Sequence, residues 1–299
     1  MQTFLTMYKR NVKLFFKDKG LFFTSLVTPL ILLVLYISFL ANVYSDSFNA
    51  IFSAMQITIG DNVLKSLVSG QLLSSLLAVS CVTVSFCSNM LMVQDKVYGV
   101  RKDLLISPVK RSTLAISYYL ATLTSTLIVC FVALGAGLVY VGIVGWYYTL
   151  GDVLLLVLDV FLLSMFGTAL SSIINYFLSS QGQISAVGSI VSSVYGFVCG
   201  AYMPLSNLGE GFRAVLMFLP GTYGTSLIRN HALRSAFANL DTSNISSQAI
   251  TEIRKLVDCN IYFFDNLVSV STMYIVLIST ILVCVGAYVL INILLKKKS

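Results

Sequence analysis

Charge and histidine are scarce in this chain of 299 residues. Only 10% of the residues are charged and 57% are hydrophobic, whereas soluble domains carry about 25% charged residues. The single histidine, His231, excludes a multi-histidine metal site, and we expect it to be a solvated residue of an external loop. No glycine is followed by lysine, so a phosphate-binding P-loop is absent, and no Gly-x-Ser-x-Gly elbow occurs. We therefore expect no catalytic residues, no metal site and no cofactor bound by this chain.

Paired cysteine motifs are also missing. The six cysteines lack the Cys-x-x-Cys spacing of zinc and redox sites. Five of them fall in apolar segments, where cysteine behaves as a small hydrophobe. Cys259 alone lies in a polar loop, and its state stays open between a disulfide with Cys199 and a free thiol, because sequence does not fix the geometry.

What the chain does have is long hydrophobic stretches. At 1.5 Å per residue, each can cross a hydrocarbon core of about 30 Å as a helix. They predict an all-α membrane protein in which residues 1–299 form one transmembrane domain with six transmembrane helices. The residues between the first two, 46–65, are expected to form an external loop. The six predicted spans are 21–44, 66–94, 112–145, 152–178, 184–203 and 266–295.

The basic residues indicate the orientation. Residues 1–19 place apolar side chains on one helical face and Lys9, Arg10, Lys13 and Lys17 on the other, which predicts an interfacial helix. Basic loops remain in the cytoplasm, so we place both termini there in a multi-pass protein of the plasma membrane, in a bacterial cell. The net charge of +7 then reflects topology, and no nucleic-acid partner is expected.

The most charged run is residues 94–111, between the second and third spans. It holds five basic residues. Val97, Val100 and Leu104 recur at helical spacing, with Lys102 opposite them. This pattern predicts a cytoplasmic helix over 94–107 on which a partner can dock. Ser107 and the proline after it are typical of an N-cap followed by the first residue of the next helix.

Polar residues inside the predicted spans have two open interpretations. Asp159 would be costly to bury as a charged group at membrane depth. In the functional interpretation it binds a cationic substrate or carries a proton. In the structural interpretation it lies near the headgroups or bonds to hydroxyls of a neighbouring helix. Serines and an asparagine in the second and fifth spans either line a pathway or permit tight helix packing. The path candidates are Ser74, Ser85, Asn89, Asp159, Ser185, Ser189 and Ser192.

Residues 204–265 form the largest region outside the spans. Residues 214–228 are apolar but too short to cross the bilayer. They are expected to form a re-entrant or interfacial segment, giving an external re-entrant hairpin before the last span.

The arrangement and two local motifs resemble the membrane subunit of type-2 ATP-binding cassette (ABC) exporters. The first motif is Gly99 followed by Leu104-Leu105-Ile106-Ser107-Pro108-Val109-Lys110-Arg111. The family's Gly-Thr-x-Glu is here Gly99-Val100-Arg101-Lys102, so the acidic residue is missing, although Asp103 is adjacent. The second is Gly200 with Pro204-Leu205, followed by Leu219-Pro220-Gly221-Thr222-Tyr223 and Arg229.

The resemblance implies partners and roles. Two copies, in a homodimer or with a sister chain, would form the path, with the second and fifth spans facing each other. Two separate ABC ATPase subunits would bind ATP and magnesium and grip the 1–19 and 94–107 helices. The outer mouth would be closed by Pro204, Pro220, Tyr223 and Arg229. The coupling residues would be Lys96, Gly99, Arg101, Lys102, Asp103, Leu104, Leu105 and Pro108.

The expected function is export of a hydrophobic or amphipathic compound, such as an antibiotic, peptide or lipid. A lipid-linked polysaccharide is an alternative substrate. A secondary transporter coupled to an ion through Asp159 is an alternative of a different class, although no internal repeat supports it.

Overall fold

The computed structural model describes residues 2–107, 109–241 and 245–294, most of which are helical. The helices up to the third span are α1 (Gln2–Lys17), α2 (Lys19–Leu35), the π-helical turn η1 (Tyr36–Leu40), α3 (Ala41–Ala54), α4 (Asp61–Ser88), α5 (Met90–Val97), α6 (Val100–Ile106) and α7 (Arg111–Gly145). The remaining elements are α8 (Leu150–Phe177), α9 (Gln181–Val198), η2 (Leu205–Asn207), α10 (Glu210–Leu216), α11 (Pro220–Ala232), α12 (Arg234–Asp241), α13 (Ser247–Leu256), β1 (Tyr262–Phe263), β2 (Asn266–Leu267) and α14 (Val270–Leu294).

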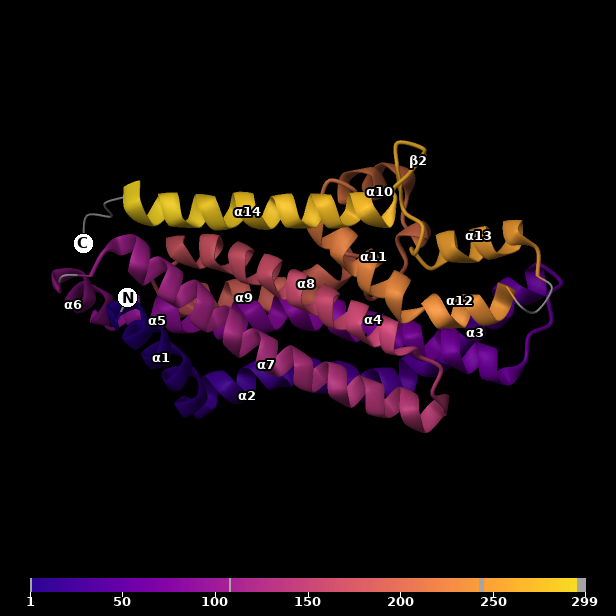
Figure 1. Cartoon of the computed structure of the whole chain (residues 1–299), viewed down its shortest axis with the longest axis horizontal. Coiled ribbons are helices and arrows are strands. Elements are labelled where there is room, and N and C mark those ends of the chain that lie inside the picture. The colour runs from indigo at the N-terminus through magenta and orange to yellow at the C-terminus, as the bar shows by residue number, and fades with distance from the viewer. Residues whose placement is uncertain (1, 108, 242–244, 295–299) are drawn as a thin grey trace.

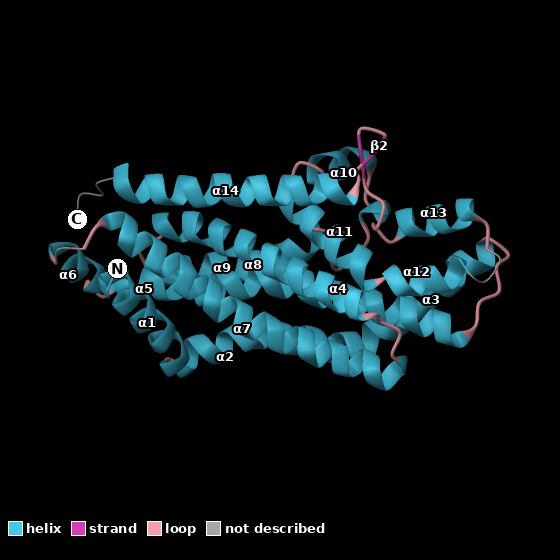
Figure 2. Ribbon diagram, viewed as in Figure 1, coloured by secondary structure: helices cyan, strands magenta, loops and turns pink. Residues whose placement is uncertain are grey.

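The long helices run side by side along the longest axis of the molecule (Figures 1 and 2). α1 begins and α14 ends at the same end of this bundle, which we call the termini end. α3, α12 and α13 lie at the opposite end, which we call the distal end. Which side of the membrane the termini end faces stays a prediction.

Five of the described helical segments are long and apolar enough to cross a membrane. α9 is shorter, with 18 residues, which correspond to about 27 Å. The prediction of an all-α membrane protein is confirmed, whereas the count of six spans stays a prediction. The five segments are Lys19–Ala54, Asp61–Val97, Arg111–Gly145, Leu150–Phe177 and Val270–Leu294.

The first spanning segment extends further than predicted. α2, η1 and α3 form one continuous helical run to Ala54, so the prediction of a loop over 46–65 is wrong for most of that range. Tyr44, Phe48 and Phe52 recur every four residues and are buried against α4. This apolar stripe keeps the chain helical, and Asp46 is simply exposed on the opposite face.

α4 is the central helix of the bundle. Every residue from Ser66 to Ser88 is buried, and α2, α3, α7, α8, α9 and α11 all pack on it. Gly167 of α8 lets the two backbones approach closely, because a Cβ atom there would lie 3.0 Å from the carbonyl oxygen of Cys81 and 3.0 Å from the Cα of Val82. The serine-rich span is therefore the core of the subunit.

The charged run after α4 forms two helices rather than one. Gly99 has φ +79°, a left-handed conformation that ends α5 before α6 begins. Ser107 ends α6, with its hydroxyl donating to the carbonyl of Leu104 at 2.6 Å, and α7 begins at Arg111. The prediction that Ser107 caps the following helix is therefore wrong. Pro108 lies outside the described residues.

The region 204–265 is mostly helical. The apolar stretch 214–228 is divided between α10 and α11, with 217–219 as the connection. α11 lies inside the bundle against α4, α8 and α14, whereas α10 and β2 project beyond α14 (Figure 1). Whether these elements are re-entrant stays a prediction.

Candidate functional site

The residues predicted to couple the chain to a partner divide into two groups. Lys96 donates to the carbonyl oxygens of Tyr176 and Leu178 at the end of α8, at 2.6 and 2.5 Å. Arg101 donates to the Oδ1 atom of Asn292 in α14 at 3.0 Å, and its guanidinium lies 5.2 Å from the centre of the Tyr176 ring. These two side chains fasten α5 and α6 to α8 and α14.

The second group points outward from α6. Lys102, Asp103 and Leu105 are exposed, while Leu104 is half-buried against α7 and its neighbours. Tyr98 and Ile106 are 73% and 84% exposed, and neither was among the predicted coupling residues. Together with Lys102 they form an exposed basic and apolar surface at the termini end, which we call the α6 surface.

α1 is attached to this unit by an ion pair that the sequence did not reveal. Arg10 donates to both carboxylate oxygens of Asp95 in α5, at 2.6 and 3.0 Å. The hydroxyl of Tyr118 in α7 donates to the same carboxylate at 2.5 Å. The hydrogen bond to Asp95 raises the pKa of Arg10. α1, predicted to be only an interfacial helix, is thus held to α5 and α7.

The polar residues of the second span join α4 to its neighbours within the subunit. The hydroxyl of Ser85 donates to the carbonyl of Cys81 at 2.6 Å and lies 3.4 Å from that of Thr168 in α8. Asn89 donates to two α8 hydroxyls, and Ser74 donates to its own helix at Gln71. All three predicted path residues of the second span are buried, and Ser85 and Asn89 join it to α8 within the single chain.

The serines of α9 differ from those of α4. Ser185 and Ser189 are exposed and Ser192 is half-buried. Ile190, Val194 and Phe197 are also exposed along this helix. Of the two predicted groups of path hydroxyls, only the α9 group lies on the surface of the chain.

Asp159 lies in a network with the buried His231 and the half-buried Tyr274. Its Oδ2 atom is 2.5 Å from Nδ1 of His231 in α11, and its Oδ1 accepts a 2.6 Å bond from the hydroxyl of Tyr274 in α14. Asp159 is 1% exposed and His231 is 7% exposed. The prediction of a solvated His231 is therefore wrong, because α11 lies within the bundle. The network ties α8, α11 and α14 together at their distal halves.

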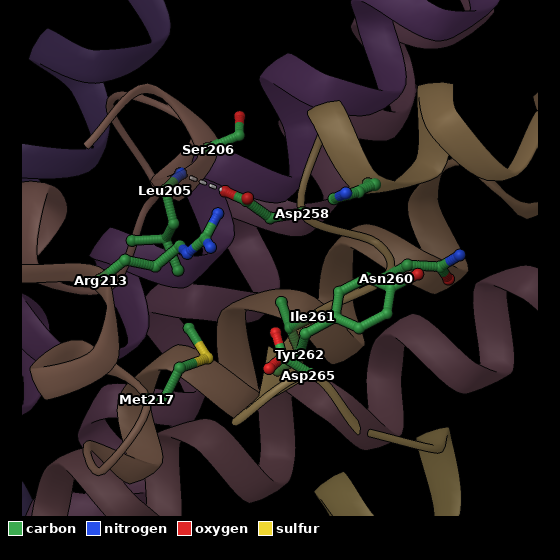
Figure 3. Close-up of a pocket in the computed structure, with 10 residues that line it drawn as sticks. Leu205, Ser206, Arg213, Met217, Asp258, Asn260, Ile261, Tyr262 and Asp265 are labelled. Carbon is green, nitrogen blue, oxygen red and sulfur yellow. Dashed lines mark hydrogen bonds between the residues drawn. The ribbon is translucent and has the colours of Figure 1, made fainter. Parts of the chain in front are cut away.

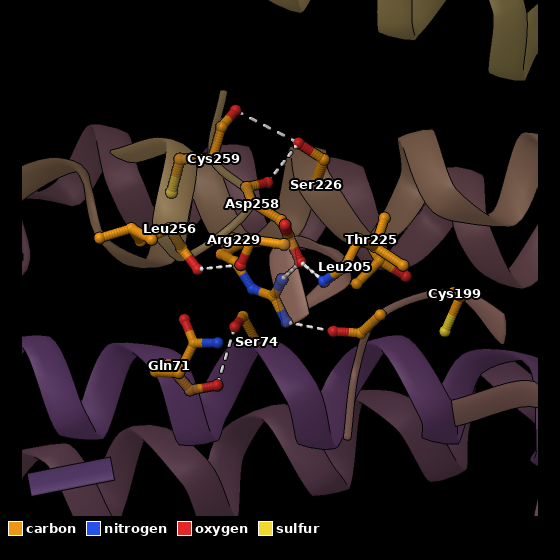
Figure 4. A network of polar contacts seen from close by, with 12 residues as sticks. Gln71, Ser74, Cys199, Leu205, Thr225, Ser226, Arg229, Leu256, Asp258 and Cys259 are labelled. Carbon is orange, nitrogen blue, oxygen red and sulfur yellow. Dashed lines mark hydrogen bonds and ion pairs between the residues drawn. The ribbon is translucent and has the colours of Figure 1, made fainter. Parts of the chain in front are cut away.

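One predicted gate residue, Arg229, forms a buried ion pair with Asp258 (Figure 4). Arg229 donates to the Oδ2 atom of Asp258 at 3.1 Å and to the carbonyl of Gly200 at 2.8 Å, and Asp258 also accepts from the backbone N–H of Leu205 at 2.6 Å. Burial raises the pKa of Asp258 to about 6, against the opposing effect of the Arg229 guanidinium. The pair fixes the turn after α9 against α11.

The other gate residues end or begin helices nearby. Pro220 occupies the first turn of α11, where its missing N–H costs nothing. Pro204 precedes η2, and the hydroxyl of Tyr223 donates to the carbonyl of Met217 at 2.6 Å. Cys199 and Cys259 are both free thiols, and burial raises the pKa of Cys259 to about 12, so it is unreactive. Among the described residues, no three His, Cys, Asp or Glu side chains are grouped to hold a metal ion.

These features define a multi-pass helical membrane protein with one buried central helix, a basic surface at the termini end and a tightly bonded distal end. The family comparison agrees with this class. The model of the ABC-2 type transporter family matches residues 2–232, and the chain belongs to that family. The match ends with α11, so α12, α13, the hairpin and α14 lie beyond it. Comparisons with curated proteins and with solved structures gave no match.

Proposed function

We propose that the chain is the permease subunit of an ABC exporter, which moves a hydrophobic or amphipathic compound out of the cytoplasm or the inner leaflet. Family membership supports the permease role. The α6 surface is the observation that carries the proposal further, because an exposed basic and apolar surface at the termini end fits a cytosolic partner. The membrane is the bacterial plasma membrane, and the termini end faces the cytoplasm.

In this proposal, ATP and magnesium are bound by two separate ATPase subunits. Those subunits contact the α6 surface through Lys102, Tyr98 and Ile106. Movement of α6 is transmitted to α1 through the Arg10–Asp95 pair, to α8 through Lys96 and to α14 through Arg101. These bonds connect the proposed docking surface to three parts of the bundle, as force transmission requires.

A second copy of the chain completes the path in this proposal. α4 is enclosed within its own subunit, so its hydroxyls are unsuited to face the partner copy. α9 instead presents exposed Ser185 and Ser189 beside exposed Ile190 and Phe197. We assign this mixed surface to the homodimer interface and the path between the two copies. Asp159 is assigned a structural role, because both of its carboxylate oxygens are bonded within the subunit.

The coupling role is tested by charge reversal at Lys102. The Lys102→Glu variant should fold normally, because the side chain is exposed, and should lose ATP-driven transport in vesicles that contain the ATPase subunits. Lys65→Glu is the matched control and should transport normally, because Lys65 is an exposed lysine near the start of α4, beside Asn239 of α12. Arg101 is less informative, because reversal there also breaks its bond to Asn292.

Two results would contradict the proposal. One is the isolation of the chain from its native membrane without a nucleotide-binding partner, together with transport that needs only an ion gradient. The other is unchanged coupled transport in Lys102→Glu, which would place the contact elsewhere on the termini end.

A further inference from the structure

A strained aromatic turn lies immediately before the last span. β1 and β2 pair as an antiparallel hairpin with Phe263 opposite Asn266, so Phe264 and Asp265 form a two-residue turn. Both have positive φ, +44° and +65°. Turns of this kind favour Asn-Gly, because bulky side chains are strained at positive φ. Phe264 at this position therefore opposes folding unless its ring gains a favourable contact.

The rest of the described chain does not bury this ring. Phe264 is 67% exposed and Phe218, which follows α10, is 64% exposed. The two ring centres are 6.2 Å apart, and the Phe263 ring lies 4.8 Å from that of Phe264. α10 and β2, which lead to and from these rings along the chain, carry further exposed apolar side chains. We call this set the distal aromatic surface, and its residues are Phe212, Val215, Phe218, Phe264 and Leu267.

The surface lies beside a helix that faces lipid. α14 begins at Val270, three residues after Leu267, which limits their separation along the chain to about 10 Å. Ile275 and Leu282 of α14 are 66% and 69% exposed, as expected for a span in contact with acyl chains. Figure 1 shows α10 and β2 projecting beyond α14 at its distal end.

The polar groups beside the rings fit the headgroup region of a bilayer. Arg213, Tyr262 and Asp265 line a cavity of about 270 Å³ (Figure 3). Arg213 and Asp265 also line a neighbouring cavity of about 220 Å³, together with Glu210 and Phe264. A guanidinium and two carboxyl groups next to aromatic rings match the phosphate and ammonium groups of a zwitterionic phospholipid lying over its acyl chains.

We propose that the distal aromatic surface docks on glycerophospholipids of the leaflet at the distal end, with Phe264 and Phe218 at the level of the ester carbonyls. Contact with lipid supplies the burial that the turn lacks within the chain. The hairpin lies beyond the stretch matched by the family, and the proposal does not depend on the direction or substrate of transport.

Tryptophan quenching in lipid nanodiscs tests this contact. The chain has one tryptophan, Trp146, which is replaced in a Trp146→Phe background. Phe264→Trp reports from the turn, and Gln248→Trp, exposed on α13, is the matched control outside the surface. Phe264→Trp should lose most of its emission to phospholipid brominated near the carbonyl and little to aqueous acrylamide. Gln248→Trp should show the reverse.

Leu267→Trp provides a second reporter, because Leu267 lies in β2 and is 55% exposed. It separates docking from any disturbance of the strained turn. Acrylamide quenching as strong as in Gln248→Trp, without bromolipid quenching, would place the surface in water and overturn the proposal. Protection from both quenchers would also overturn it, because protein, such as a second copy of the chain, would then cover the surface.

Discussion

An arginine–aspartate pair lies at each end of the bundle, and the two pairs differ mainly in their access to solvent. At the termini end, the Arg10 side chain is 28% exposed and that of Asp95 is 8% exposed. At the distal end, the corresponding values for Arg229 and Asp258 are 1% and 7%. Both aspartates accept further hydrogen bonds, from Tyr118 and from the backbone of Leu205 respectively.

This difference has a mechanical meaning. The termini pair costs less to open, because water reaches the Arg10 guanidinium and Tyr118 still donates to the buried Asp95 carboxylate. A sealed pair costs several kcal/mol to open, because an unpaired charge then remains buried. The distal pair therefore suits a fixed closure, whereas the termini pair suits an element that shifts when the proposed ATPase partner moves.

The largest effect is expected from removing the distal cation. Arg229→Gln leaves the Asp258 carboxylate buried without its charge partner, and we expect a loss of about 3–5 kcal/mol in the free energy of unfolding. Thermal and denaturant unfolding in detergent measure it. The double variant Arg229→Met with Asp258→Leu should recover only part of the loss, because the carbonyl of Gly200 and the N–H of Leu205 lose their partners. Wild-type stability in Arg229→Gln would show that this pair does not hold the distal end.

The same site predicts a dependence of stability on pH. Burial raises the pKa of Asp258 from 3.8 to about 6, so between these values the folded protein binds more protons than the unfolded chain. The free energy of unfolding therefore falls as pH rises from about 4 to 6, by about 3 kcal/mol from this group, and is then level. Unfolding measured across this range should show the slope in the wild type. Asp258→Asn should lose it, and an equal slope in that variant would assign it to other groups.

An intermediate loss of stability is expected at Asp159, because asparagine is uncharged but has nearly the same shape as aspartate. Asp159→Asn keeps one acceptor for Tyr274 but loses the charge beside His231, and we expect a loss of about 1–3 kcal/mol. Transport per folded molecule should be unchanged. Loss of transport with unchanged stability would instead support the ion-coupled alternative and contradict the structural role.

Sequence patterns predicted most of the fold. Long apolar runs located the five spanning segments and the cations of residues 1–19 predicted α1, whereas the single helix predicted over 94–107 is broken at Gly99. The predicted loop over 46–65 was wrong, because Phe48 and Phe52 pack on α4 and keep most of this stretch helical. Local patterns do not carry such tertiary information.

The candidate site was much less predictable. Asp159 was identifiable because an acid inside a span needs a partner, and Tyr274 supplies the neighbouring hydroxyl that was expected. His231 was missed, because it is 72 residues away and follows a short apolar segment. Arg10 and Asp95 are 85 residues apart, and nothing local connects them. Pairing between distant polar residues depends on how the helices pack, which one sequence does not specify.

The smallest stability effect is expected at the termini pair, and it decides whether the two ends differ as proposed. Arg10→Gln should cost about 1 kcal/mol in the free energy of unfolding, because Arg10 is partly exposed and the carboxylate retains its bond from Tyr118. Lys9→Gln, an exposed neighbour on α1, is the matched control and should leave stability unchanged. ATP-driven transport in Arg10→Gln should fall much more than its stability, because α1 is released from α5. A stability loss as large as that of Arg229→Gln would show that both pairs are rigid closures, and the mechanical distinction between the two ends would then fail.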